Sequence, residues 1–173
     1  MTHSKTLIVY YSRQGENYMG GRIVQLKKGN TETVAEMIAE LTGGDLFQVD
    51  TVADYPSDYT ETTNVAKREL RDNVRPAIVN PPDNIDAYDV VYICFPNWWG
   101  TMPMAMWTFV DRYDWSGKTV LPLCTHEGSR MGRSEKDVKA LCKGATVLKG
   151  LAIEGGHVGG AQKEISKWVT QGT

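Results

Sequence analysis

The sequence predicts an α/β fold, namely a three-layer α/β/α sandwich around a five-stranded parallel sheet. Two observations lead to this prediction. Five short apolar runs rich in β-formers alternate with five segments whose apolar residues recur at helical spacing, and such alternation is typical of a parallel sheet covered by helices on both faces. In addition, the run at residues 90–95 is almost wholly apolar, as expected of a strand buried on both faces.

The chain has 173 residues, with no internal repeat, no low-complexity segment and no change of composition along its length. Such a chain is long enough for one well-buried domain and too short for two. We therefore expect a single domain over residues 1–173, with an insertion at residues 14–28 that is described below.

The expected strands and helices are separated by polar turn signals, of which residues 80–83 (NPPD) are the clearest. The strands are expected at residues 6–11, 45–50, 89–95, 119–125 and 146–153. The helices are expected at about residues 30–41, 60–74, 102–113, 134–143 and 161–169. The apolar faces of the first two helices consist of Val34, Ile38 and Leu41, and of Ala66, Leu70 and Val74.

Start and stop signals support two of these helices. Asn30 or Thr31 can cap the first helix, and Gly43-Gly44 can end it. Pro96 ends the run at residues 90–95, because proline cannot donate to a ladder, and Pro103 is tolerated in the first turn of the helix that follows.

Composition argues against several classes of function. The net charge is −2 and there is no basic cluster, which argues against binding to nucleic acid or to an anionic membrane. No apolar run approaches the roughly 20 residues that a membrane-spanning helix needs, and the first residues lack a signal-like apolar core. A cytoplasmic protein is therefore expected.

Neither metal binding nor cysteine chemistry is indicated. The three histidines are scattered and lack the spacing of a metal site. Cys94, Cys124 and Cys142 are odd in number and irregularly spaced, so they are interpreted as small core hydrophobes. A catalytic thiol at Cys124 is the less favoured alternative.

Three unusual loops, at residues 12–31, 96–101 and 125–132, follow the first, third and fourth expected strands. The carboxyl ends of parallel strands meet at one edge of the sheet, where open α/β sheets bind their ligands. Ser12 and the sequence Gly29-Asn30-Thr31 offer hydroxyls, an amide and helix N-terminal N–H groups, which suit a phosphate. An ordinary asparagine cap is the alternative. The sequence contains neither G-x-x-x-x-G-K-[ST] nor G-x-G-x-x-G after the first strand.

The other two loops could hold a flat ring. Trp98 and Trp99 can stack on a heteroaromatic system, with Gly100 allowing close approach. The alternative is that one or both pack under the following helix. Residues 125–129 (THEGS) could bind the polar rim of a ring, whereas a hydrolytic site there is disfavoured because Ser129 is not in a G-x-S-x-G elbow.

Taken together, Ser12…Gly29-Asn30-Thr31, Phe95–Gly100 and Cys124–Ser129 resemble the flavodoxin family, in detail the short-chain flavodoxin-like proteins of bacteria, over essentially the whole chain. The resemblance implies strand order 2-1-3-4-5 and an FMN cofactor, with its phosphate after the first strand and its ring between the loops after the third and fourth. The implied cofactor-binding residues are Ser12, Arg13, Asn30, Thr31, Pro96, Asn97, Trp98, Trp99, Gly100, Thr125, Glu127, Gly128 and Ser129.

The insertion Gln14–Lys28 departs from the family, whose phosphate loop is the compact S/T-x-x-G-N-T. Gly20-Gly21 within it is compatible with a tight hairpin turn. One interpretation is a solvated surface excursion. The other is a flap beside the flavin edge, in which Tyr18 or Met19 narrows access and Arg22, Lys27 or Lys28 attracts an anionic partner.

The resemblance implies an FMN-binding redox protein that carries electrons between a redox partner protein or an NAD(P)H-linked donor and an acceptor. The flavin supplies the chemistry, so no catalytic side chain is expected. The family's electron carriers tend to be strongly acidic and this chain is close to neutral, which leaves two alternatives open. One is an FMN-dependent NAD(P)H:quinone or azo-type reductase on the same fold. The other is a flavodoxin-like interaction module without flavin.

Overall fold

The computed structural model of the protein describes residues 4–173, and its centre is a parallel sheet in the order β4-β1-β5-β6, with β7 and β8 both paired to β6 at the far edge. The strands are β1 (Thr6–Tyr10), β4 (Asp45–Gln48), β5 (Val90–Pro96), β6 (Thr119–His126), β7 (Thr146–Val147) and β8 (Leu151–Glu154). This order is the expected 2-1-3-4-5, and the α/β sandwich is confirmed.

The fifth strand position is divided, where one continuous strand was expected. β7 pairs with the start of β6 at Val120, and β8 resumes pairing at Leu123. The gap lies beside Pro122, which has no N–H to offer a neighbouring strand. At the same point Gly150 passes so close that a Cβ on it would lie 3.0 Å from the Pro122 carbonyl oxygen.

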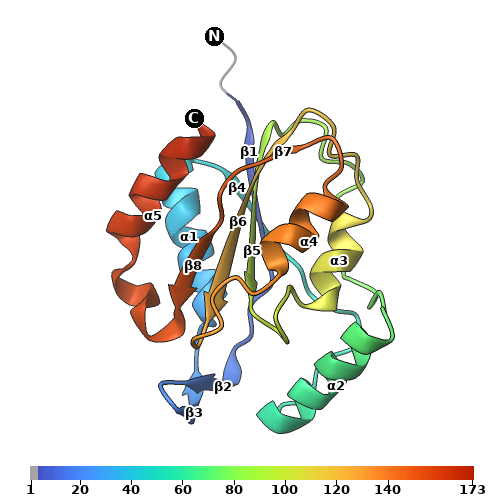
Figure 1. The fold of residues 1–173 in the computed structure, drawn as a ribbon, viewed down its shortest axis with the longest axis vertical. Helices are drawn as coiled ribbons and strands as arrows, with labels where there is room; N and C mark the ends of the chain where they lie inside the picture. The colour runs from blue at the N-terminus through green and yellow to red at the C-terminus, as the bar shows by residue number, and fades with distance from the viewer. Residues whose placement is uncertain (1–3) are drawn as a thin grey trace.

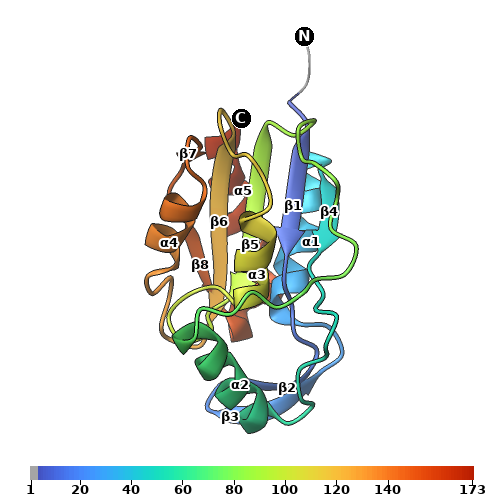
Figure 2. The same cartoon turned by 90° about the vertical axis from the view of Figure 1, so that its right-hand side faces the viewer.

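Two helical layers cover the sheet (Figures 1 and 2). Helices α1 (Asn30–Thr42) and α5 (Gln162–Val169) lie on one face, and α3 (Met104–Val110) and α4 (Ser134–Leu141) lie on the other. Successive side chains of β1 pack alternately against the two helical layers, because strand side chains point alternately to the two faces of the sheet. Ile8 packs in the cluster that includes α1 and α5, and Val9 in the cluster that includes α3. The side chains of β5 are buried from Val90 to Phe95, as the sequence predicts.

The insertion forms a hairpin of its own beyond the carboxyl end of β1 (Figure 1). Its strands are β2 (Gly15–Met19) and β3 (Arg22–Leu26), paired antiparallel. Gly20 and Gly21 form the turn with φ of +63° and +83°, values that a two-residue hairpin turn requires and that glycine adopts without strain. The tight-hairpin interpretation is confirmed.

Helix α2 (Tyr59–Arg71) lies beside the hairpin below the sheet edge (Figures 1 and 2). Glu16 of β2 accepts a hydrogen bond at Oε2 from the Tyr59 backbone N–H at 2.7 Å, and the Tyr18 and Tyr59 rings are stacked with centroids 6.3 Å apart. The Arg13 guanidinium donates to the carbonyl oxygens of Pro56 at 3.2 Å and Ser57 at 2.9 Å. We call this hairpin and helix the hairpin–α2 wall, because the insertion is braced on α2 and does not extend freely into solvent.

Two residues expected on apolar helix faces lie elsewhere. Leu41, near the end of α1, is 46% exposed, and Val74 lies beyond the end of α2 and is 40% exposed. In both segments the apolar periodicity of the sequence extends beyond the last residue at which the helix contacts the core. Among residues 4–173, the structure contains no helix with both the length and the apolar character needed to cross a membrane.

Candidate functional site

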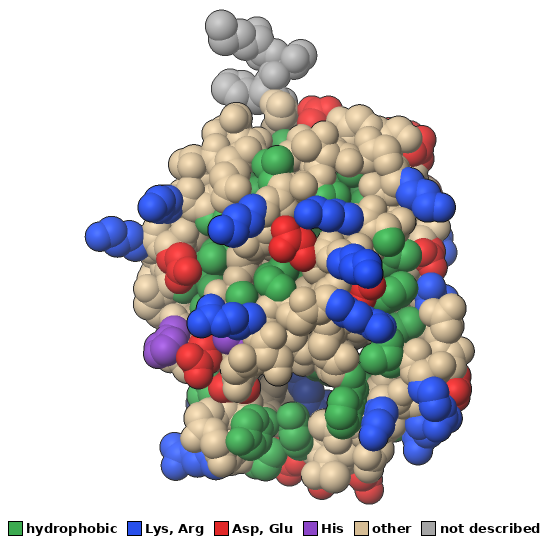
Figure 3. Space-filling model, viewed as in Figure 1, with side chains coloured by type: hydrophobic (Ala, Val, Ile, Leu, Met, Phe, Trp, Pro, Cys, Tyr) green, Lys and Arg blue, Asp and Glu red, His purple; other side chains and the backbone are tan. Residues whose placement is uncertain are grey.

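A groove runs across the carboxyl ends of β1, β5 and β6, and the hairpin–α2 wall covers it. Two adjoining cavities of about 300 and 460 Å³ form the groove. We call the first the α1 lobe, because it reaches Asn30 and Thr31, and the second the α2 lobe, because it reaches Thr62, Thr63 and Ala66. Figure 3 shows the hollow between the wall and the body of the molecule. Both lobes are lined by Arg13, Asn17, Tyr59, Asn97, Trp98 and Ser129.

The N-terminus of α1 opens into the α1 lobe. Its N-cap residue, Gly29, has no side chain to cap the helix, and Ser12 from the β1 loop does so instead, since Ser12 Oγ accepts from the Glu32 N–H at 3.0 Å. A Cβ on Gly29 would collide with Ser12 Oγ and with the Arg13 carbonyl, so only glycine fits there. Within residues 4–173, the backbone N–H groups of Asn30 and Thr31 have no acceptor. These two N–H groups and the positive end of the helix dipole form a candidate anion site.

A hydroxyl pair joins this helix end to the end of β6. The Thr31 and Thr125 Oγ1 atoms are 2.8 Å apart, and both residues are buried. Asn97 joins the β5 and β6 loops in the same way, because its amide donates to the Arg130 carbonyl and its Oδ1 accepts from the Gly100 N–H, both at 2.8 Å. The groove floor is therefore held by bonds between loops of different strands, which fixes the relative position of the lobes.

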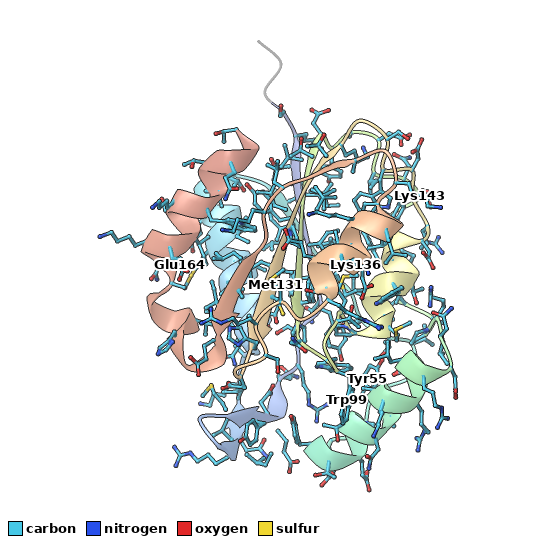
Figure 4. All side chains as sticks on the ribbon, viewed as in Figure 1. Tyr55, Trp99, Met131, Lys136, Lys143 and Glu164 are labelled. Atoms are coloured by element: carbon cyan, nitrogen blue, oxygen red, sulfur yellow. The ribbon has the colours of Figure 1, made fainter. Side chains whose placement is uncertain are left out.

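The two tryptophans have different environments. Trp98 is partly buried, lies edge-on to Tyr11 and Tyr55 with centroids 5.1 Å away from each, and lines both lobes. Trp99 is 50% exposed and donates its indole N–H to the Thr63 carbonyl of α2 at 2.9 Å. Figure 4 shows Trp99 beside α2. Trp98 thus packs against the core and also lines both lobes of the groove. Trp99 connects the β5 loop to α2 through its hydrogen bond and lines only the α2 lobe.

Trp99 holds this position in an uncommon backbone conformation, with φ of +57°. Such values are rare for a bulky residue and cost energy that the surroundings must offset. The indole hydrogen bond to α2 and the Lys67 ammonium, 5.0 Å from the ring centroid, supply part of this compensation.

Glu127 projects from the β6 loop toward the hairpin. Its Oε2 accepts from the Gly20 backbone N–H at 3.4 Å, while its Oε1 is buried and has no hydrogen-bond partner among the described residues. Burial is the largest cause of the raised pKa of this carboxyl. Burial also lowers the pKa of the neighbouring His126, whose Nδ1 accepts from the Gly128 N–H at 2.8 Å. Both groups are thereby shifted toward their neutral forms.

The structure brings most of the expected cofactor residues together. Eleven of them line the groove, namely Arg13, Asn30, Thr31, Pro96, Asn97, Trp98, Trp99, Gly100, Thr125, Glu127 and Ser129. Ser12 lies behind the helix end and borders the neighbouring cleft, and Gly128 is engaged with its own loop through His126. Lining a groove is not ligand contact, so the role of each residue toward a cofactor stays a prediction.

Sequence reasoning missed the groove residues that come from α2 and the hairpin, apart from Tyr18 in the flap hypothesis. They are Asn17, Tyr59, Thr62, Thr63 and Ala66. No local signal marks those on α2, because Thr62 and Ala66 read as ordinary residues on the inner face of a helix. Only the packing of α2 on the hairpin turns that face toward the groove.

The three cysteines lie in the core and line neither lobe of the groove. All three cysteines are buried, and burial raises the pKa of the Cys124 thiol to about 12, which leaves it without thiolate character at neutral pH. The interpretation as core residues is confirmed. Within the described part of the chain, no group of three or more His, Cys, Asp and Glu residues could hold a metal ion.

Comparisons with known proteins agree with this geometry. A family model described as Flavodoxin matches residues 25–172. A protein from Bacteroides uniformis ATCC 8492, provisionally assigned as a flavoprotein, has a TM-score of 0.78 at 26% identity over 96% of this chain and 98% of its own. One from Bacteroides eggerthii DSM 20697, with the same provisional assignment, has a TM-score of 0.77 at 28% identity over 98% of both chains.

A third structure contains a ligand. It is a flavoprotein from Lactobacillus acidophilus NCFM in complex with FMN, with a TM-score of 0.66 at 25% identity over 96% of this chain and 99% of its own. A search of curated proteins found no match.

Proposed function

Because this chain belongs to the flavodoxin family, we propose that it binds one FMN in the groove and transfers electrons through the bound flavin. The observation that carries the proposal is the continuity of the groove. An anion site at the α1 N-terminus opens directly into a space bordered by Trp98 and by the loops after β5 and β6. A phosphate and a flat ring require this sequence of environments. The FMN complex of the related Lactobacillus protein supports the same cofactor.

The residues present fit FMN. The N–H groups of Asn30 and Thr31 would bind the phosphate, and the Arg13 guanidinium at the junction of the lobes would add positive potential. Trp98 and the Asn97–Gly100 loop would border the ring, and Thr125–Ser129 its polar rim or the ribityl chain. When bound, FMN supplies one- and two-electron transfer. The protein binds and orients it and limits its contact with water.

The α2 lobe favours a second candidate, an FMN-dependent reductase of the NAD(P)H:quinone or azo type. This lobe has a volume of about 460 Å³ and lies next to the space assigned to the ring. Its walls combine Trp98 and Trp99 with the threonines of α2, which suits a planar molecule that carries hydrogen-bonding oxygens or nitrogens. Electron transfer to or from a small substrate there would make the protein an enzyme. An electron carrier would instead exchange electrons with a protein partner or an NAD(P)H-linked donor.

Colour and reduction kinetics separate these candidates. The purified protein should be yellow and should release FMN, not FAD, on denaturation. Anaerobic stopped-flow mixing with NADPH then distinguishes the two redox functions, because rapid bleaching of the flavin identifies a reductase. Reduction by dithionite but not by NADPH identifies a carrier served by another donor. A protein that binds no FMN would refute both and leave the flavin-free interaction module.

A further inference from the structure

Glu127 has an environment that does not suit a carboxylate. Its Oε1 is buried without a hydrogen-bond partner, and the Gly20 N–H contact to Oε2 is long at 3.4 Å. Burying a charged carboxylate that is so poorly paired is costly. The neutral acid avoids that cost, and its O–H becomes a donor.

Glu127 also lies next to the anion site. A Cβ on Gly155 would collide with Glu127 Oε1 and with Asn30 Nδ2, so these two atoms border the same small space. The N–H of Asn30 is one of the two unpaired donors at the start of α1, and both side chains line the α1 lobe. An anion held by this helix end therefore comes close to the Glu127 carboxyl group.

The charged and titratable groups around Glu127 do not neutralise it. Glu154 of β8 opposes its ionisation, and His157 favours it when protonated, but both side chains are largely exposed. The other such groups that line the two cavities bordered by Glu127 are Arg13, Tyr18, Arg22, Tyr59 and His126. Arg13 donates to the carbonyls of Glu16, Pro56 and Ser57, and none of these groups forms an ion pair with Glu127.

We propose that Glu127 couples FMN binding to the uptake of one proton, so that the flavin phosphate enters the groove beside a neutral Glu127. The proposal rests on the FMN site proposed above. The proton comes from solvent and forms the O–H bond of the Glu127 carboxylic acid, and no electron is transferred. A phosphate oxygen can then accept from this O–H, whereas a carboxylate would repel the phosphate.

The direction of the pH dependence follows from this coupling. The phosphate is a second negative charge near the carboxyl, so binding raises the Glu127 pKa further. Between the pKa of the flavin-free protein and that of the complex, FMN affinity falls as pH rises, by up to about tenfold per pH unit for one linked proton. The phosphate itself titrates near pH 6, and its dianion suits the helix end better. The phosphate therefore acts in the opposite sense and must be subtracted.

Comparison with the Glu127→Gln variant removes the contribution of the phosphate titration from the pH dependence. Glutamine has nearly the same shape, stays neutral and keeps a donor, so it mimics the protonated acid at every pH. FMN dissociation constants are measured by flavin fluorescence from pH 5 to 8.5 on apoprotein of the full chain, for the natural protein, Glu127→Gln and the control Glu154→Gln. The control removes the neighbouring exposed carboxylate. The ratio of the natural constant to that of Glu127→Gln should rise by about tenfold or more across this range. The control should keep the pH step of the natural protein.

Calorimetry gives a second readout that a purely structural role would not change. FMN titrations in two buffers of different ionisation enthalpy should show about one more proton taken up by the natural protein than by Glu127→Gln, as one linked group requires. Parallel pH profiles, or equal proton uptake, would overturn the proposal. Should Glu127→Gln fail to fold, titration of the natural protein above about pH 7.5 decides, because the phosphate is then already a dianion. No proton uptake under that condition refutes the coupling. If Glu127→Gln folds but binds no FMN while the natural protein does, a neutral residue 127 is not the binding form and the coupling is refuted. If the natural protein itself binds no FMN, the proposed FMN site fails.

Discussion

Replacing Thr31 by valine tests how the start of α1 is joined to the end of β6. The Thr31 and Thr125 hydroxyl oxygens are 2.8 Å apart, and only 2% and 4% of these residues is exposed. Valine has nearly the shape of threonine without the hydroxyl, so Thr31→Val leaves the Thr125 hydroxyl buried and unpaired. Orphaning a buried hydroxyl costs about 1–3 kcal/mol, and we expect the free energy of unfolding to fall by about 2 kcal/mol.

The double variant Thr31→Val/Thr125→Val should lose less than the sum of the two single variants. Replacing both partners by apolar groups of the same shape is close to neutral, because no polar atom is left unpaired. Urea unfolding of the natural protein, both single variants and the double variant measures the difference. With a slope of about 2 kcal/mol per molar urea, each single variant should shift the midpoint by about 1 M. Additive losses in the double variant would refute the reasoning.

The same four proteins show whether the Thr31 hydroxyl touches the cofactor. Thr31→Val should weaken FMN binding, because the unpaired Thr125 hydroxyl disturbs the packing of the first turn of α1. If the hydroxyl only positions the helix, the double variant regains most of the affinity. We expect this result, since the hydroxyl is already paired with Thr125. An equal loss of about 1–3 kcal/mol in the single and double variants would instead show a direct bond to the phosphate.

Four further changes probe the walls of the groove. Trp98→Ala should lower the free energy of unfolding, measured by urea denaturation, by about 3 kcal/mol and should also weaken FMN binding. Trp99→Ala should leave the FMN affinity within about threefold of the natural value, because the Trp99 indole lies on α2. Ala66→Phe fills the α2 lobe and should slow stopped-flow reoxidation of the reduced flavin by the quinone menadione about tenfold or more. Ala140→Phe, an exposed site on α4, should not. Replacing residues 14–28 by a two-residue link should keep FMN binding and speed electron exchange with NADPH or menadione, because it removes half of the wall.

Each of these predictions has an outcome that would contradict it. Equal effects of Trp98→Ala and Trp99→Ala on FMN affinity would show that the different surroundings of the two side chains do not determine their contributions to FMN binding. Unchanged menadione kinetics in Ala66→Phe would remove the α2 lobe as an acceptor site. Loss of FMN binding on replacing residues 14–28 would make the hairpin part of the phosphate site.

Much of the fold was predictable because its signals are local. The apolar run of β5 is interpretable without its neighbours, since a strand buried on both faces needs apolar residues at every position. The Gly20-Gly21 turn is equally local, because positive φ at two successive residues selects glycine. Most cofactor candidates were found for a topological reason, namely that the carboxyl ends of parallel strands share one edge.

Other features depend on contacts between distant segments. The sequence shows two adjacent tryptophans but not their difference, which arises because Trp99 meets the Thr63 carbonyl on a helix 36 residues earlier in the chain. The division of the last strand follows from its pairing beside Pro122, not from residues 146–153 themselves. Leu41 is exposed because the apolar period of α1 runs beyond the surface that covers it.

The sequence alone thus determined the sandwich and the strand edge that carries the groove, and it predicted the anion site at Asn30 and Thr31, because period, turn chemistry and helix ends are encoded within a few residues. Only the tertiary structure decided that the insertion is braced on α2, that this wall supplies a second lobe, and that the Oε1 atom of Glu127 is buried near Asn30 without a hydrogen-bond partner. Those features depend on groups brought together from segments far apart in the chain. Their burial and pairing exist only once the chain has folded.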